Sequence, residues 1–183
     1  MPKRPTKPVV GKTKYFTSLV MDEEKYFLGD SVRVNEKSDD ERYANICKIF
    51  KKNNEYLALV RWHLKPTEVF EELPEFVGEA ELFDSESYQV VPVESIYDKI
   101  YIIPFEKYFQ AETVDTDTFY IRATYQKTQT FKPDFAFWPR NCLCQKIINP
   151  DLEFVRCDSC EDLFHFECVG YEPTLDVWVC PNH

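Results

Sequence analysis

The residues best suited to chemistry lie in the last 42 positions of the chain, where cysteine and histidine side chains are concentrated. Six of the seven cysteines and two of the three histidines fall in this segment. They form four close pairs with the spacings C-x-C, C-x2-C, H-x2-C and C-x2-H. In chain order these candidate metal ligands are Cys142, Cys144, Cys157, Cys160, His165, Cys168, Cys180 and His183.

The pairing of these ligands indicates zinc. Two side chains from one short turn can reach a single ion at ~2.0–2.3 Å, whereas the third and fourth ligands must come from another segment. Eight ligands suffice for two four-coordinate sites. A disulfide framework would leave the interleaved histidines unexplained. We therefore predict that the chain binds two zinc ions.

The ligand pattern resembles the plant homeodomain (PHD) finger, which also has an aromatic residue where Trp178 precedes Cys180 by two positions. The resemblance implies interleaved pairing, in which alternate ligand pairs hold each ion. One ion is then expected on Cys142, Cys144, His165 and Cys168, and the other on Cys157, Cys160, Cys180 and His183. Most PHD fingers have Cys at the last position, but imidazole is also a good zinc ligand.

A RING-type finger, as found in ubiquitin ligases, has the same interleaved topology and is the enzyme-related alternative. It opens with C-x2-C and usually has His as its fourth ligand, whereas this chain opens with C-x-C and has His165 as its fifth. Zinc sites filled by four protein ligands leave no open coordination position, and His63 is the only histidine outside them. We therefore predict that the chain is not an enzyme.

The elements that position this segment are expected to be β-strands. Val32 and Val34 alternate with polar residues, and Tyr101–Pro104 is a short apolar run. Prolines divide the region before Trp138 into short segments, and a long helical periodicity is missing. The pattern predicts a mainly β fold, a compact barrel or sandwich of short strands.

Several short sequences in this region resemble the bromo-adjacent homology (BAH) domain. They are Gly29-Asp30, Tyr43-Ala44, Arg61-Trp62, Pro66-Thr67-Glu68, Glu81-Leu82-Phe83 and Phe131-Lys132-Pro133. The resemblance implies a distorted barrel of short strands. It divides the chain into a basic flexible tail (1–14), a BAH domain (15–138) and a PHD-type finger (139–183). This order is similar to that of the plant Short Life and Early Bolting in Short Days histone readers.

The BAH resemblance implies a pocket for methylated lysine, since such domains surround the ammonium with aromatic faces. The residues at the corresponding positions are Tyr43, Trp62 and Leu64, so two walls are aromatic and one is aliphatic. Ser87 and Gln89 stand where the family selects the flanking peptide sequence. The alternative for the two aromatic residues is ordinary core packing.

The finger resembles those that bind the amino-terminal tail of histone three with unmodified lysine four. Asn141 and Leu163 stand where a methyl-lysine cage needs aromatic residues. Acidic residues lie instead near the third ligand, and carboxylates suit an ammonium with three donors. These candidate peptide-binding residues are Asp151, Glu153 and Asp158. The alternative is that they are solvated surface charges.

The charge distribution limits the partners. The chain has a net charge of −10, although residues 1–14 contain five Lys and Arg and no acid, so the body is strongly acidic. We expect basic partners such as histone tails, together with chromatin-complex proteins, and no nucleic-acid binding outside the basic tail. No apolar run is long enough to span a membrane, and we predict a nuclear protein. A scaffold subunit whose pockets no longer bind peptides is the remaining alternative.

Overall fold

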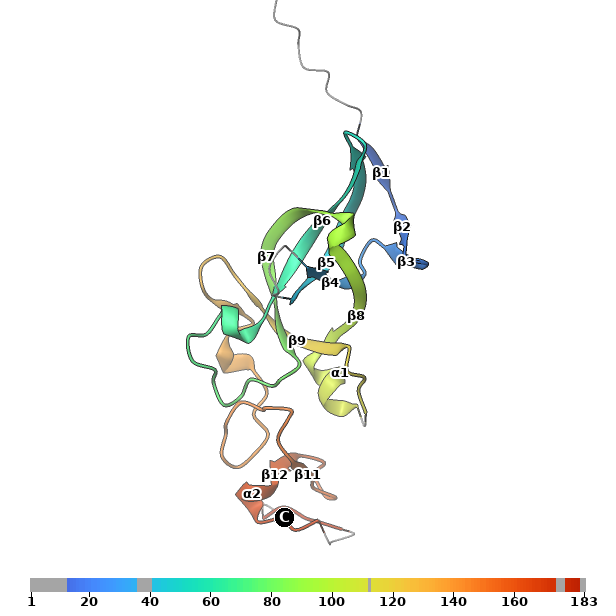
Figure 1. Cartoon of the computed structure of the whole chain (residues 1–183). Coiled ribbons are helices and arrows are strands. Elements are labelled where there is room, and N and C mark those ends of the chain that lie inside the picture. Colours follow the sequence, from blue (N-terminus) through green and yellow to red (C-terminus); the bar gives the residue numbers. More distant parts are fainter. Residues whose placement is uncertain (1–12, 36–40, 112, 174–176, 182–183) are drawn as a thin grey trace, which may run out of the picture. The chain divides into compact units, whose positions relative to one another are not determined.

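A computed structural model describes residues 13–35, 41–111, 113–173 and 177–181 (Figure 1). The predicted basic tail, apart from its last two residues, lies outside the described residues. The chain divides into two compact units, Met1–His63 with Ser85–Tyr101, and Leu64–Asp84 with Ile102–His183. Among the described helices, none has the length and apolar character needed to cross a bilayer.

The first unit is built from β-strands, which confirms the predicted mainly β class. β1 pairs with β5, β5 pairs with both β4 and β6, and β4 pairs with β8, all antiparallel. β2 and β3 form a separate two-stranded sheet. β7 and β8 contribute residues to both units. The bounds are β1 Lys14–Phe16, β2 Ser18–Met21, β3 Glu24–Phe27, β4 Ser31–Asn35, β5 Glu41–Lys52, β6 Glu55–Leu64, β7 Glu81–Pro92 and β8 Ile96–Pro104, with a 3-10 turn at Val93–Ser95.

The longest hairpin joins β5 and β6 through a two-residue turn. Asn53 and Asn54 form this turn with φ of 49° and 70°. Asparagine tolerates this left-handed region better than most residues, and two successive residues with positive φ match the right-handed twist of the flanking strands. The outer end of this hairpin is seen beside β1, which pairs with β5 there (Figure 1).

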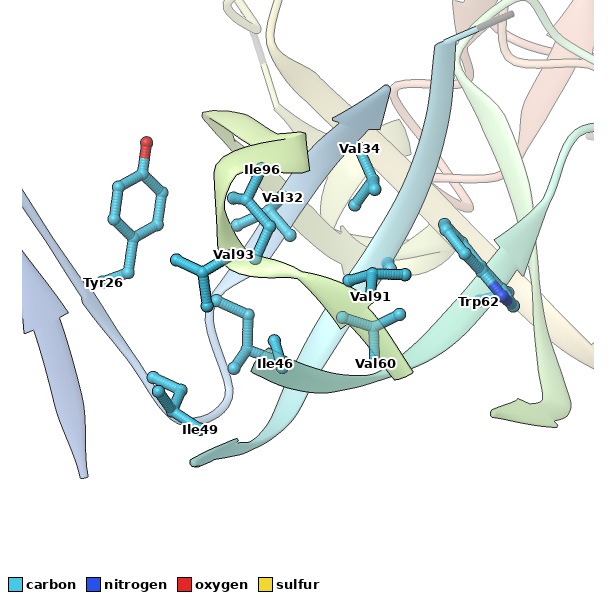
Figure 2. Packing of buried hydrophobic residues seen from close by; sticks show 12 residues of the cluster. Tyr26, Val32, Val34, Ile46, Ile49, Val60, Trp62, Val91, Val93 and Ile96 are labelled. Atoms are coloured by element: carbon cyan, nitrogen blue, oxygen red, sulfur yellow. The ribbon is translucent and has the colours of Figure 1, made fainter. Parts of the chain in front are cut away.

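The core of the first unit is mainly aliphatic. Val32 and Val34 of β4 are completely buried, as their alternation with polar residues predicts. They pack with side chains from β3, β5, β6 and the β7–β8 connection (Figure 2). The labelled members of this cluster are Tyr26, Val32, Val34, Ile46, Ile49, Val60, Trp62, Val91, Val93 and Ile96.

The second unit has few regular elements and an aromatic core. Phe83, Ala123 and Trp138 are buried at its centre. Rings pack around them mainly edge to face, for example Phe83 on Phe131 at 5.0 Å between centroids, an arrangement that aromatic quadrupoles favour. The elements are η1 Pro66–Glu68, α1 Phe105–Gln110, β9 Thr118–Tyr125, β10 Phe131–Lys132, η3 Phe135–Phe137, β11 Phe154–Arg156, β12 Leu163–His165 and α2 Phe166–Val169.

Candidate metal centre and peptide-binding surfaces

The first donor cluster brings together four predicted zinc ligands from two parts of the metal-binding segment (139–183). The ligand atoms of Cys142, Cys144, His165 and Cys168 lie within 4.8 Å of one another. His165 Nδ1 is 3.5 Å from Cys144 Sγ and 3.7 Å from Cys168 Sγ. A tetrahedron with bonds of ~2.0–2.3 Å has edges of about 3.3–3.8 Å, so these separations fit zinc.

The second donor cluster contains Cys157, Cys160 and Cys180, whose sulfurs also lie within 4.8 Å of one another. Cys160 Sγ is 3.9 Å from Cys180 Sγ. The predicted fourth ligand, His183, lies outside the described residues. The seven described donors therefore separate into the same two groups as the interleaved arrangement, and both clusters are compatible with zinc.

The small β11–β12 hairpin contributes donors to both clusters. β11 ends one residue before Cys157, and its partner β12 ends at His165. The single helical turn α2 follows at once and holds Cys168 three residues after His165, on the same side of the turn. Gly170, with φ of 59°, ends this turn in the left-handed conformation that glycine adopts most readily. The interleaving is thus a consequence of the antiparallel hairpin.

The sulfur environments favour bound cations. Burial raises the pKa of Cys142, but backbone hydrogen bonds at Cys144 and His165 outweigh this and lower the pKa to about 6. Burial and the neighbouring Cys142 raise the pKa of Cys168 to about 11. A thiolate at one cysteine therefore disfavours ionisation of the next. A divalent ion bound between them removes this repulsion by neutralising both charges.

The core of the metal-binding segment is small and depends on the donors themselves. Three of its five buried residues are cysteines, and the other two are Val155 and Phe164. Trp178 packs edge to face on Phe164 at 5.4 Å. Asp158 is linked to this core, because its carboxylate accepts a 2.7 Å hydrogen bond from the backbone N–H of Trp178. Asp158, a predicted peptide-binding residue, therefore has a contact within the segment.

A buried ion pair joins β9 to β7, and its arginine also bonds to the metal-binding segment. The Arg122 and Glu81 side chains are 2% and 0% exposed, with Nε and Oε1 2.5 Å apart. Arg122 Nη1 also donates to the carbonyl of Ile148 at 2.9 Å, and Tyr120 donates to Glu81 at 3.0 Å. Burial raises the pKa of Glu81 above its ordinary value, although Arg122 opposes this rise. Ile148 lies between the first and second ligand pairs, so the cation is bonded to the metal-binding segment.

A second set of contacts joins the same segment to the loop at residues 75–80. Asn149 Nδ2 donates to the carbonyls of Glu75 and Val77 at 2.8 and 3.2 Å. Asp151 accepts a 2.6 Å hydrogen bond from the N–H of Glu79. At Gly78 an added Cβ would lie 2.6 Å from the Tyr120 hydroxyl, so only glycine permits this approach. Asp151, predicted to bind peptide, thus has a contact to the backbone of this loop.

A cavity of about 590 Å³ lies beside the first donor cluster. Its wall includes Cys144, His165 and Cys168, so the cavity lies directly against three donors of that cluster. Carboxylates predominate over cations among its other charged residues, which are Glu75, Asp151, Glu153, Glu167, Arg140 and Lys146. Lys146 forms an exposed ion pair with Glu75 at 2.8 Å. The remaining carboxylates make the cavity suitable for a cationic group.

Glu153 is the predicted peptide-binding acid that is most available for a ligand. It is exposed and lines the cavity. Within the described part of the chain, its carboxylate makes no hydrogen bond or ion pair, in contrast to Asp151 and Asp158.

The residues predicted to hold methyl-lysine are divided between the two units. Tyr43 and Trp62 belong to the first unit and are 7% and 1% exposed, whereas Leu64 packs on the aromatic core of the second. The Arg42 guanidinium lies over the Trp62 ring, 4.0 Å from its centroid. A cation of the protein thus occupies one face of the ring that was expected to receive the ligand ammonium.

The two residues expected to select the flanking peptide are exposed on β7. Ser87 donates its backbone N–H to the Ser85 hydroxyl at 3.1 Å. Gln89 accepts a 3.1 Å hydrogen bond from the Trp62 indole N–H. Gln89 is therefore next to the predicted pocket, and its carbonyl oxygen is engaged with one of the pocket's walls.

Arg42, Glu81 and Arg122 make contacts at these sites that were not predicted from the sequence. Arg122 is the single charged residue of a strand rich in apolar and aromatic residues, and a single cation in such a strand signals a buried partner. The partner itself gave no comparable signal, since Glu81 is 41 residues away. Arg42 stands beside Tyr43 in the chain, but only the pairing of β5 with β6 brings it to Trp62.

Comparison with known proteins identifies both parts of the chain. The BAH domain model matches residues 24–134, and the PHD-finger model matches residues 142–182. The chain is similar to "Chromatin remodeling protein EBS" of Arabidopsis thaliana, with 33% identity over 126 residues, 66% of this chain and 53% of that protein. It is also similar to "Chromatin remodeling protein SHL" of the same plant, with 31% identity over 112 residues, 61% of this chain and 48% of that protein.

A solved structure gives the same fold assignment. The crystal structure of the yeast Rsc2 BAH domain superposes with a TM-score of 0.53 and 14% identity, over 64% of this chain and 53% of that one. This likeness concerns the fold alone. The chain spans about half the length of the curated relatives described above.

Proposed function

The chain belongs to the BAH-domain family and carries a PHD finger, and from this we propose that it is a nuclear, non-enzymatic chromatin reader that binds tail segments of histone three. The BAH domain (15–138) and the finger (139–183) each supply a binding surface, and two zinc ions hold the finger together. The observation that carries the proposal is the carboxylate-lined cavity beside the first donor cluster. A lysine-rich peptide is the kind of ligand that this charge favours.

On the finger, Glu153 is the residue that contacts the unmodified lysine-four ammonium. The carboxylates of Asp151 and Asp158 support this surface by accepting hydrogen bonds from the backbone N–H groups of Glu79 and Trp178. An unmodified ammonium donates three hydrogen bonds to carboxylates, whereas a trimethylated one donates none. The segment's match to the PHD-finger model supports a reader over the ubiquitin-ligase alternative.

For this surface, we expect a peptide of the histone-three amino terminus to bind more tightly with unmodified than with trimethylated lysine four in calorimetry. Glu153→Gln removes one charge-assisted hydrogen bond and should weaken binding of the unmodified peptide about 10-fold. Glu172→Gln, a matched loss of an exposed carboxylate on the same segment, should leave the affinity unchanged. Equal or tighter binding of the trimethylated peptide would contradict the assignment.

In the BAH domain, we propose that the lysine pocket (Tyr43, Trp62 and Leu64) opens when Arg42 leaves the Trp62 ring, with Ser87 and Gln89 beside the bound peptide. The Arg42 guanidinium already occupies a cation position on this ring at 4.0 Å. A trimethyl-lysine ammonium would replace one cation–π contact by another, so its net gain in the wild type is small. The second candidate, a scaffold without reader activity, is favoured by the near-complete burial of Trp62.

Substitution of Arg42, whose guanidinium occupies the Trp62 ring, distinguishes the reader from the scaffold. Arg42→Ala should tighten binding of trimethyl-lysine peptides about 3- to 30-fold, because a cation–π contact of about 0.5–2 kcal/mol no longer has to be replaced. Unmethylated peptides, used as the control, should not gain. The measurement is a modified-peptide array followed by titration of the strongest peptide. Failure of both the wild type and Arg42→Ala to retain any methylated peptide would favour the scaffold.

A further inference from the structure

The cavity beside the first donor cluster is not formed by the finger alone. Most of its wall comes from the metal-binding segment (139–183), but Glu75 and Phe76 come from the loop at residues 75–80. This loop lies within the residues that match the BAH domain model, 24–134, whereas the PHD-finger model matches 142–182. The loop and the metal-binding segment belong to the same compact unit. One cavity therefore combines side chains from two domain families.

The loop backbone that carries Glu75 and Phe76 is held in place by hydrogen bonds. Asn149 Nδ2 donates to the Glu75 carbonyl at 2.8 Å, and Arg122 Nη2 donates to the Phe76 carbonyl at 3.3 Å. The Phe76 ring packs edge to face on Trp138, with 5.5 Å between the ring centroids. A ligand therefore meets a loop that is already ordered, which lowers the entropic cost of binding.

Lys146 indicates which kind of group the Glu75 carboxylate accepts. The Lys146 ammonium contacts Glu75 at 2.8 Å, and both residues line the cavity. The two side chains are 66% and 85% exposed, and water and salt screen an ion pair in such a position, so it is weak. A primary ammonium of a ligand has the same charge and the same three donors as Lys146. Exchange of one ammonium for the other at Glu75 therefore changes the energy little.

The rest of the cavity wall also suits a lysine side chain. Four of its lining residues have large apolar side chains, namely Phe76, Ile147, Leu152 and Phe166. Lysine buries its methylene stem along apolar surface while its ammonium stays on a polar group. Arg140, the other cation of the wall, donates to the carbonyls of Phe135 and Gln145. Lys146 is thus the cation of the wall that contacts one of its carboxylates.

We propose that Glu75 of the 75–80 loop is a second binding carboxylate of the finger's peptide site, and that a primary ammonium of the bound peptide displaces Lys146 from it. Lys146 then competes with the peptide for Glu75 and lowers the affinity of the wild type. This inference rests on the proposed function, because the ligand is the same lysine-rich peptide. It makes the BAH-domain loop and the finger partners in one site, in addition to their separate surfaces.

The test is calorimetry of the full chain with the amino-terminal peptide of histone three that has unmodified lysine four. Lys146→Gln should tighten binding about 2- to 5-fold, because the peptide no longer has to replace an exposed ion pair. This gain should decrease as salt is added. Most of it should disappear when Glu75→Gln is present in the same chain, since the two substitutions act on one contact. Glu72→Gln, which removes an exposed carboxylate outside the cavity wall, should preserve the gain.

Equal gains from Lys146→Gln with and without Glu75→Gln would overturn the proposal, because net charge would then be the only cause. Weaker binding by Lys146→Gln would also overturn it, since Lys146 would then contact the ligand itself. If Glu153→Gln weakens binding while these gains are equal, the finger's peptide site stands and only the role of Glu75 is lost. Absence of binding by both the wild type and Lys146→Gln would end both proposals.

A nitrogen-15 NMR titration with the same peptide gives an independent measurement. The backbone amides of Glu75 and Phe76 should shift together with that of Glu153 as peptide is added. A shift at Glu153 without one in the 75–80 loop would confine the site to the finger and overturn the shared site. An unchanged unfolding temperature of each variant confirms that its fold is intact.

Discussion

Removal of the metal, by a chelator or by Cys157→Ala, is expected to unfold the metal-binding segment and to destabilise the whole second unit. The core cluster among the segment's donors has five buried residues, three of them cysteines, so we expect that it does not form without the ions. Structural zinc contributes about 10–16 kcal/mol to the folding of such modules. The loss should spread, because Ile148 and Phe154 pack on Phe105, Tyr120 and Phe109.

Thermal unfolding followed by near-ultraviolet circular dichroism, with metal analysis of the same samples, measures this effect. We expect about two zinc ions per chain and a decrease of at least about 10 °C in unfolding temperature on metal removal, since 1 kcal/mol corresponds to a few degrees in a chain of this size. Cys47→Ser is the control, because Cys47 belongs to neither donor cluster. Stability that is indifferent to chelator, with fewer than two ions bound, would contradict the metal assignment.

The second large effect is expected for Arg122→Leu. This substitution leaves the Glu81 carboxylate buried without its cation, and breaking a buried pair in this way costs about 3–5 kcal/mol. The double variant Arg122→Leu, Glu81→Leu removes both charges and should recover a large part of the loss. Arg140→Leu is the matched control, because Arg140 also bonds two carbonyls but lies at an exposed position.

The same variant should acquire a characteristic pH dependence. Burial raises the pKa of Glu81 above its unfolded value, and loss of Arg122 removes the interaction that opposes this rise. A carboxyl with a raised folded pKa binds more protons in the native state than in the unfolded state. The stability of the protein therefore falls as pH rises through that pKa. We therefore expect the destabilisation, measured by denaturant titration, to be larger at pH 8 than at pH 5.5. A constant difference between wild type and variant would show that Glu81 does not titrate in this range.

Local sequence was sufficient for much of the fold. The alternation of Val32 and Val34 correctly predicted a half-buried strand, because successive side chains of a strand point to opposite faces whatever the sheet around them. The short apolar segments correctly predicted a mainly β class. The division of β7 and β8 between two compact units could not be predicted, since it depends on contacts between segments far apart in the chain.

The candidate sites divide in the same way. Ligand spacing predicts the zinc donors because close pairs are a local requirement of metal coordination. Local sequence does not determine which acids stay available for a peptide. Asp151 is engaged because the 75–80 loop approaches it, whereas Glu153 remains exposed. Likewise the pairing of β5 with β6, and not the residue types alone, sets Arg42 over the Trp62 ring.

The sequence by itself determined the strand class, the candidate metal donors and the acidic character of the body. These properties follow from periodicity, ligand chemistry and composition, which act over a few residues or over the chain as a whole. Only the tertiary structure decided the Arg122–Glu81 pair, the acid facing the cavity and the contact of Lys146 with Glu75. Each of these features depends on residues that are distant in sequence. The energies of their interactions depend on burial and distance, which the linear order of residues does not contain.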